Sequence, residues 1–173
     1  QLEVALHQAA AHYKSHLDQD PTDAYEAAYA AAKKVMEMVP QEAESLSRLT
    51  LAQSQLAETR NLKGHDSRPL IREAIELGKR VIKLQPDKLL TRNNQGAYYL
   101  FLAELERDWG GDPIPVWAAG REVLLSVQKD NPDFMLTGEN LAELQQTEIG
   151  YLFDIGRAPS DKLPDLVKQA ENL

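Results

Sequence analysis

Residues 70–86, LIREAIELGKRVIKLQP, form a pattern that recurs at a fixed distance on both sides. The earlier counterpart, 46 residues before, is AYEAAYAAAKKVMEMVP at 24–40, and the later one, 46 residues after, is VWAAGREVLLSVQKDNP at 116–132. Each copy ends in proline, and further columns keep the same register: Gly64, Gly110 and Gly156; Ala28, Ala74 and Gly120; Val35, Val81 and Val127. Self-similarity at a fixed period is typical of a repeat architecture.

The composition is that of a globular protein, with 43% hydrophobic and 27% charged residues among 173. A net charge of −8 argues against nucleic acid as a partner, because binding to phosphate needs clustered Lys and Arg. The chain has no cysteine, and no apolar run reaches the roughly 20 residues that span a bilayer. We therefore expect a soluble, cytoplasmic protein without membrane contact. Because the sequence opens on Gln1 in helical pattern, we expect it to be a piece of a longer protein.

Helical periodicity dominates the segments between the breaker residues. It is clearest over residues 70–84, where the apolar positions form one helical stripe. Residues 96–103 are apolar all round, which is typical of a helix surrounded by neighbours. The expected helices cover residues 1–17, 24–39, 42–61, 70–84, 88–108, 116–129, 134–154 and 162–173. The sequence thus predicts an all-α fold: one domain over residues 1–173, built as a right-handed α-solenoid of four helix pairs with the first and last truncated.

The spacing of small residues and prolines resembles the tetratricopeptide repeat. In each pair a small residue stands twelve positions before the closing proline, as Ala28 before Pro40, Ala74 before Pro86 and Gly120 before Pro132. Another small residue follows each proline by ten positions, at Thr50, Gly96 and Ala142. The period of 46 departs from the family's period of about 34. A HEAT repeat has about the observed length, but its proline lies within the first helix, so we favour a tetratricopeptide-like array.

The loops at 64–70 and 110–116 carry a narrower resemblance. With the segments that follow them, they are similar to the tetratricopeptide arrays that follow the catalytic domain in some bacterial eukaryotic-like serine/threonine protein kinases. The glycine-rich phosphate loop and the other kinase motifs are absent from the sequence. The resemblance therefore implies a docking region and not a catalyst.

No combination of residues predicts catalysis or a cofactor. His12 and His16 are four residues apart, with His7 nearby, but no acidic residue completes a zinc motif, so we expect no metal site. Solvent-exposed helix faces explain the many carboxylates better than acid–base chemistry does. Trp117 aligns with apolar residues and is expected in the core, whereas Trp109 has no such explanation and stays a candidate ligand contact.

The leading hypothesis is a scaffold that binds a protein or peptide segment on the concave face implied by the tetratricopeptide resemblance. Its small, polar and acidic composition favours a neutral or basic partner. The alternative function is self-association through apolar ends of the array. Within the stripe, Leu100 could instead fill the core. The predicted contact residues are Ser47, Leu51, Ser54 and Glu58; Asn93, Ala97, Leu100 and Glu104; and Glu139, Glu143 and Gln146.

Overall fold

The computed structural model describes residues 2–157 of the chain, and in this range it contains seven α-helices and no strand. The all-α prediction is therefore confirmed for this range, while the helix expected over residues 162–173 lies outside it. The helices are α1 (Leu2–His16), α2 (Thr22–Met38), α3 (Ala43–Leu62), α4 (Arg68–Leu84), α5 (Leu89–Asp108), α6 (Ile114–Asp130) and α7 (Met135–Asp154).

The helix bounds recur at the interval found in the sequence. The even-numbered helices begin at residues 22, 68 and 114, and α3, α5 and α7 begin at residues 43, 89 and 135. A residue with positive φ follows each of α1, α3, α5 and α7: Asp18 at 53° and Gly64, Gly110 and Gly156 at 77°, 73° and 70°. Glycine adopts this conformation without a steric penalty, which accounts for the glycine column just past the helix ends.

An aspartate lies two residues before each of α2, α4 and α6. The Oδ1 atoms of Asp20, Asp66 and Asp112 accept a hydrogen bond from the first backbone N–H of the following helix, at 3.0, 3.0 and 3.1 Å. These N–H groups have no acceptor within the helix, so the carboxylate replaces the missing carbonyl and also favours the positive end of the helix dipole.

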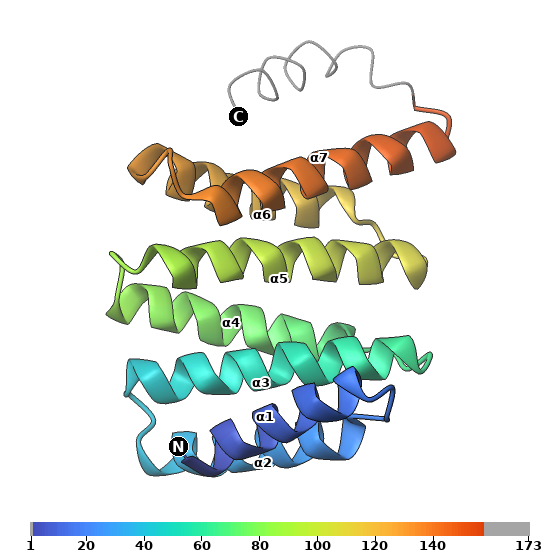
Figure 1. The fold of residues 1–173 in the computed structure, drawn as a ribbon. Helices are drawn as coiled ribbons and strands as arrows, with labels where there is room; N and C mark the ends of the chain where they lie inside the picture. The colour runs from blue at the N-terminus through green and yellow to red at the C-terminus, as the bar shows by residue number, and fades with distance from the viewer. Residues whose placement is uncertain (1, 158–173) are drawn as a thin grey trace.

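The seven helices stack in chain order, from α1 and α2 at one end to α7 at the other (Figure 1). Consecutive helices run in opposite directions, and each packs against the next; α5 also contacts α7. Each of the four apolar clusters contains residues of at least three helices, so the core runs along the stack and not within one pair. This arrangement places α3, α5 and α7 side by side on one face.

Small residues occupy positions where the helices meet. Ala28 and Ala74 are fully buried, and a Cβ on Gly120 would lie 2.9 Å from the Cβ of Tyr99, so α5 and α6 are in close contact there. Trp117 is 0% exposed and meets Tyr151 edge to face at 5.5 Å, which confirms its predicted place in the core. No residue of the apolar centre of α5, Gly96 to Ala103, is fully exposed.

Two interhelical ion pairs occupy the same two repeat positions with opposite polarity. Glu26 of α2 pairs with Arg60 of α3, whose Nη2 lies 2.9 Å from the glutamate Oε1. At the equivalent positions 46 residues later, Arg72 of α4 pairs with Glu106 of α5. The next equivalents, Ala118 and Leu152, are both uncharged.

Candidate partner-binding groove

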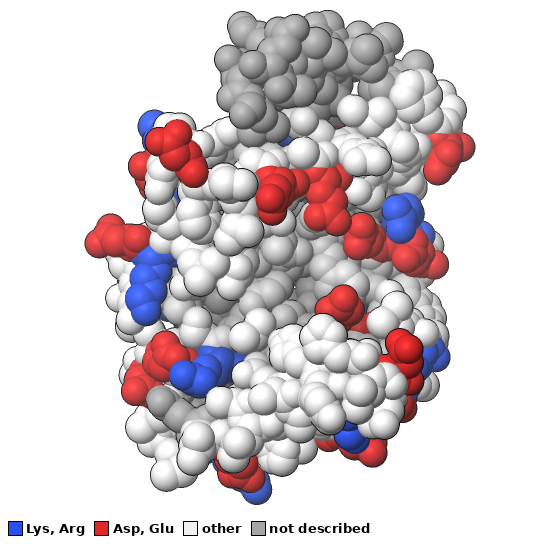
Figure 2. Space-filling model, viewed as in Figure 1, with Lys and Arg blue, Asp and Glu red and all other residues white. Residues whose placement is uncertain are grey.

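A groove of about 540 Å³ lies on the face formed by α3 and α5. Helix α4 runs beneath it and contributes Gly78 and Val81 to the floor, while Gln8 of α1 closes one side. The remaining lining residues are Glu44, Ser47, Arg48, Thr50 and Leu51 of α3, Lys88 just before α5, and Leu89, Leu90, Thr91, Asn94, Gln95 and Tyr98 of α5. Figure 2 shows the hollow in the middle of this face.

The floor of the groove depends on a glycine within a helix. Gly78 belongs to α4, and a Cβ added to it would lie 1.9 Å from Oε1 of Gln95, which crosses directly above. Gln95 donates a hydrogen bond from Nε2 to the carbonyl of Ile75 at 3.0 Å. Its Oε1 is buried and has no hydrogen-bond partner within the described part of the chain. A buried acceptor of this kind is uncommon in a folded protein.

Tyr98 and Ser54 connect the two helices along the groove. Their hydroxyl groups share a hydrogen bond, and Ser54 also donates to the carbonyl of Leu51 at 2.9 Å. Burial raises the pKa of Tyr98, and the hydrogen bond with Ser54 partly opposes this. Tyr98 therefore stays neutral and presents an aromatic ring with a fixed hydroxyl to the groove.

The structure brings part of the predicted binding stripe to this groove. Ser47 and Leu51 line it, and Ser54 lies against Tyr98. Ala97 and Glu104 are half-buried on α5. The remaining predicted contacts that stay exposed lie on α3 and α7: Glu58, Glu139, Glu143 and Gln146.

Two predicted contact residues are buried instead, so they present no surface to a partner. Asn93 is 3% exposed, and its Oδ1 accepts hydrogen bonds from Thr137 at 3.0 Å and Asn140 at 3.1 Å, joining α5 to α7. Leu100 is 5% exposed and belongs to the apolar cluster that contains Trp117. The alternative reading of Leu100 as a core residue is therefore the one that the structure supports. Helix α5 has neighbours on more sides than the stripe assumed, because it contacts α7 as well as α4 and α6.

Sequence reasoning missed the groove residues of α4 and the start of α5. Lys88, Asn94 and Gln95 are not among the predicted contacts, and Gly78 lies within the helix predicted over residues 70–84. A glycine in a helix interior lowers helix stability and so indicates a close approach by another group. Gly78 was therefore the available signal.

Charge is distributed unevenly along this face. Beside the groove, Arg48 pairs with Glu44 at 3.0 Å and Lys88 adds a second cation. Acidic side chains gather over α7 and the end of α5 (Figure 2). There, burial raises the pKa of Glu104; Arg107 opposes the rise, and Glu143 and Asp108 add to it. The acidic end therefore attracts positive charge.

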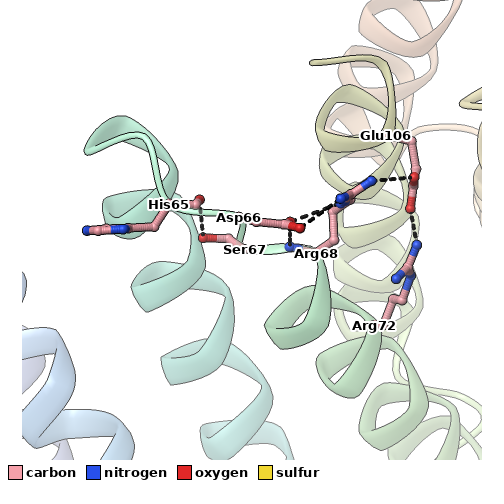
Figure 3. Close-up of polar contacts among 6 residues, drawn as sticks. All are labelled: His65, Asp66, Ser67, Arg68, Arg72 and Glu106. Atoms are coloured by element: carbon pink, nitrogen blue, oxygen red, sulfur yellow. Dashed lines mark hydrogen bonds and ion pairs between the residues drawn. The ribbon is translucent and has the colours of Figure 1, made fainter. Parts of the chain in front are cut away.

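Trp109 lies in a separate cluster at the turn between α5 and α6. Its ring centroid is 5.9 Å from the guanidinium carbon of Arg68, a cation–π distance. Arg68 also bonds Asp66, at 2.9 Å from Nε and 2.7 Å from Nη2, and Glu106 at 3.3 Å (Figure 3). These hydrogen bonds lower the pKa of Asp66. Arg72 bonds the other oxygen of Glu106. Trp109 thus has a structural explanation that the sequence did not offer.

The histidines of α1 do not converge with other ligands. His7 faces Glu3 at 3.9 Å, and His12 lies near Gln55 and the edge of Tyr25. Within residues 2–157 no group of three or more His, Asp or Glu side chains is placed to hold a metal ion. In the same range no helix combines the length and apolar character that crossing a membrane requires.

Comparison with known proteins adds no relative. No protein-family model matches the chain, and no curated protein or solved structure shows a significant match to it.

Proposed function

We propose that the protein is a scaffold that holds a protein or peptide segment in the groove between α3 and α5. In this proposal the stacked helices continue the 46-residue register as a right-handed, tetratricopeptide-like α-solenoid. The observation that carries the proposal is the groove itself, at about 540 Å³, which falls within the size range of ligand sites in proteins.

The chemistry of the walls suits an extended segment. Leu51, which is 40% exposed, together with Leu89, Leu90 and Tyr98 can accept an apolar side chain. Asn94 and Thr91 offer donors and acceptors for a peptide backbone. An extended segment can therefore satisfy its own polar groups while it buries an apolar anchor.

The preferred partner has a basic part next to its apolar anchor. Glu58, Glu104 and Glu143 lie outside the groove lining, further along α3, α5 and α7, so a Lys or Arg in a segment that extends beyond the groove gains from charge complementarity. The Arg48 and Lys88 end favours a neutral or acidic residue instead. The segment therefore has a preferred direction in the groove.

Selection from a displayed library of random peptides tests this proposal. We expect the selected peptides to combine an apolar residue with Lys or Arg, and to lose at least about tenfold in affinity for Leu51→Glu. Leu62→Glu is the matched control, because Leu62 is an exposed leucine on the same helix but outside the groove. Peptides that bind both variants equally well would place the binding surface elsewhere.

A further inference from the structure

Helix α1 presents a second apolar surface, on the side opposite its contacts with the core. Val4 and Ala11 are buried, and Gln8 bonds Gln55 of α3 at 2.9 Å, so the helix is fixed in orientation. Its outer face, which we call the α1 stripe, consists of Leu2, Leu6, Ala9, Ala10, Tyr13 and the following Leu17. The four large members are 75%, 60%, 66% and 49% exposed, in chain order. Contiguous apolar exposure of this kind marks an interaction surface.

Half of the positions of the α1 stripe have equivalents that are buried in α3. Leu6, Ala10 and Tyr13 correspond, 46 residues on, to Ala52, Leu56 and Thr59 of α3, all of which are buried. Leu56 packs there against Ala24 and Tyr25 of the preceding α2. The next equivalents include Leu102 and Leu105 of α5, which pack against Ile71 and Ile75 of α4. The α1 stripe is therefore a helix-packing surface without a helix on it in residues 2–157.

We propose that the α1 stripe binds the same stripe of a second copy of this chain, as an antiparallel helix pair with twofold symmetry. The successive spacings of the stripe are four, three, one, three and four residues, the same from either end. In an antiparallel pair centred between Ala9 and Ala10, Leu2 meets Leu17 of the second copy and Leu6 meets Tyr13. A twofold interface must be self-complementary. The order of large and small residues in the α1 stripe meets this requirement, because it is the same from either end.

Packing and charge agree with this register. Ala9 and Ala10 lie at the centre, where small side chains allow the helix axes to approach to roughly 8 Å. Glu3 and Lys14 lie on the same flank of the stripe, so the antiparallel pair sets Glu3 of one copy beside Lys14 of the other. The interface is small, and we expect a reversible dimer with a dissociation constant on the order of 10–100 μM.

Sedimentation velocity of the full chain over a concentration series tests the dimer. We expect a monomer–dimer equilibrium that Leu6→Glu shifts toward monomer by at least about tenfold, while circular dichroism keeps the helical signal. Met38→Glu is the matched control, because Met38 is 81% exposed on α2 and lies outside the stripe. A chain that stays monomeric at about 300 μM would overturn the proposal, and so would growth beyond the dimer, which a closed twofold pair forbids.

Charge exchange and cross-linking test the register. Glu3→Lys and Lys14→Glu should each weaken the dimer, and the double variant should restore it; a double variant as weak as the singles would rule out the antiparallel arrangement. The chain has no cysteine, so Ala10→Cys introduces a unique thiol beside the twofold axis. Mild oxidation should link this variant into dimers faster than Ala30→Cys, whose exposed alanine lies on α2. Equal rates would place the contact elsewhere.

Discussion

Glu104 carries its charge in an unfavourable position. The residue is half-buried between α5 and α7, and burial raises its pKa above the ordinary value of 4.5, with Glu143 and Asp108 adding to the rise and Arg107 opposing it. Between the ordinary pKa and the raised pKa of the folded state, the folded protein binds more protons than the unfolded chain does. The free energy of unfolding therefore falls as the pH rises through that window. A charge kept against stability is typical of functional surfaces.

Glu104→Gln should therefore raise the melting temperature at pH 7. The gain should shrink as the pH falls through the window and vanish below about pH 4, because Glu104 is then protonated in both states. Thermal melts at several pH values measure this, with the exposed Glu139→Gln as the control. A gain that is independent of pH would show that the carboxylate charge is not its cause.

A larger side chain at Ala74 would test how closely the helices pack. Its side chain is fully buried on α4, and the equivalent residues Ala28 and Gly120 are buried as well. Ala74→Leu should lower the free energy of unfolding by about 1–3 kcal/mol, because the added carbons force neighbouring side chains off their rotamers. Urea denaturation gives the change, and Ala30→Leu on the exposed side of α2 is the control. An unchanged midpoint for Ala74→Leu would mean that the site can accommodate the extra volume.

At the scale of the elements, one junction replaces apolar packing by charge. Arg121 of α6 bonds Glu148 of α7, whose side chain is 3% exposed. The equivalent residues 46 positions earlier are Ile75 and Leu102, which belong to one apolar cluster between α4 and α5. The fold therefore tolerates either solution at this position, although a buried ion pair contributes less to stability than its contacts suggest.

Replacing Arg121 and Glu148 by their apolar equivalents distinguishes the cost of breaking the ion pair from the cost of replacing it. Arg121→Ile should destabilise the protein by roughly 3 kcal/mol, since it removes a charged partner of a glutamate whose side chain is only 3% exposed. The double variant with Glu148→Leu should recover most of this loss or exceed the parent. Urea melts of the parent, both singles and the double decide it. A double variant as unstable as Arg121→Ile would show that the site cannot repack like the α4–α5 junction.

The helices were predictable because their bounds depend on local chemistry. The starts of α2, α4 and α6 follow aspartates that bond the first N–H, and the column of glycines marks positive φ just past the longer helices. The helix predicted over residues 70–84 begins two residues later than α4, which includes Arg68 and Pro69 in its first turn. Proline is compatible with the first turn of a helix, where its missing N–H is not needed.

At the scale of the molecule, each helix packs mainly against its neighbours in the chain. Stability in such an array is approximately a sum of local terms, and elements with neighbours on both sides open least often. Amide hydrogen exchange should therefore be slowest in the buried centres of α4 and α5 and faster in α1. Exchange followed by mass spectrometry measures this directly. Protection that is uniform from α1 to α7 would indicate a single cooperative unit.

The lining of the groove was predictable only in part. Ser47 and Leu51 of the predicted stripe line it, because α3 follows the repeat register. Asn93 and Leu100 occupy equivalent or nearby positions on α5, yet contacts with Thr137 and with the Trp117 cluster bury them. Such burial depends on whether α7 lies as far from α5 as α5 lies from α3. The repeat period in the sequence does not determine these distances between helices.

The two ion pairs of opposite polarity, Glu26 with Arg60 and Arg72 with Glu106, distinguish the correct helix pairing from an exchanged one in this repetitive chain. Arrays of similar units are prone to misassembly, in which a helix occupies a neighbour's place or exchanges between copies. If α2 took the place of α4 beside α5, Glu26 would face Glu106, and if α4 took the place of α2 beside α3, Arg72 would face Arg60. Both exchanges bring like charges together, and Glu106 is too buried for water to screen it well. The opposite polarity of the two ion pairs therefore disfavours exchanged helix pairings, so that repeats of similar shape assemble in one order.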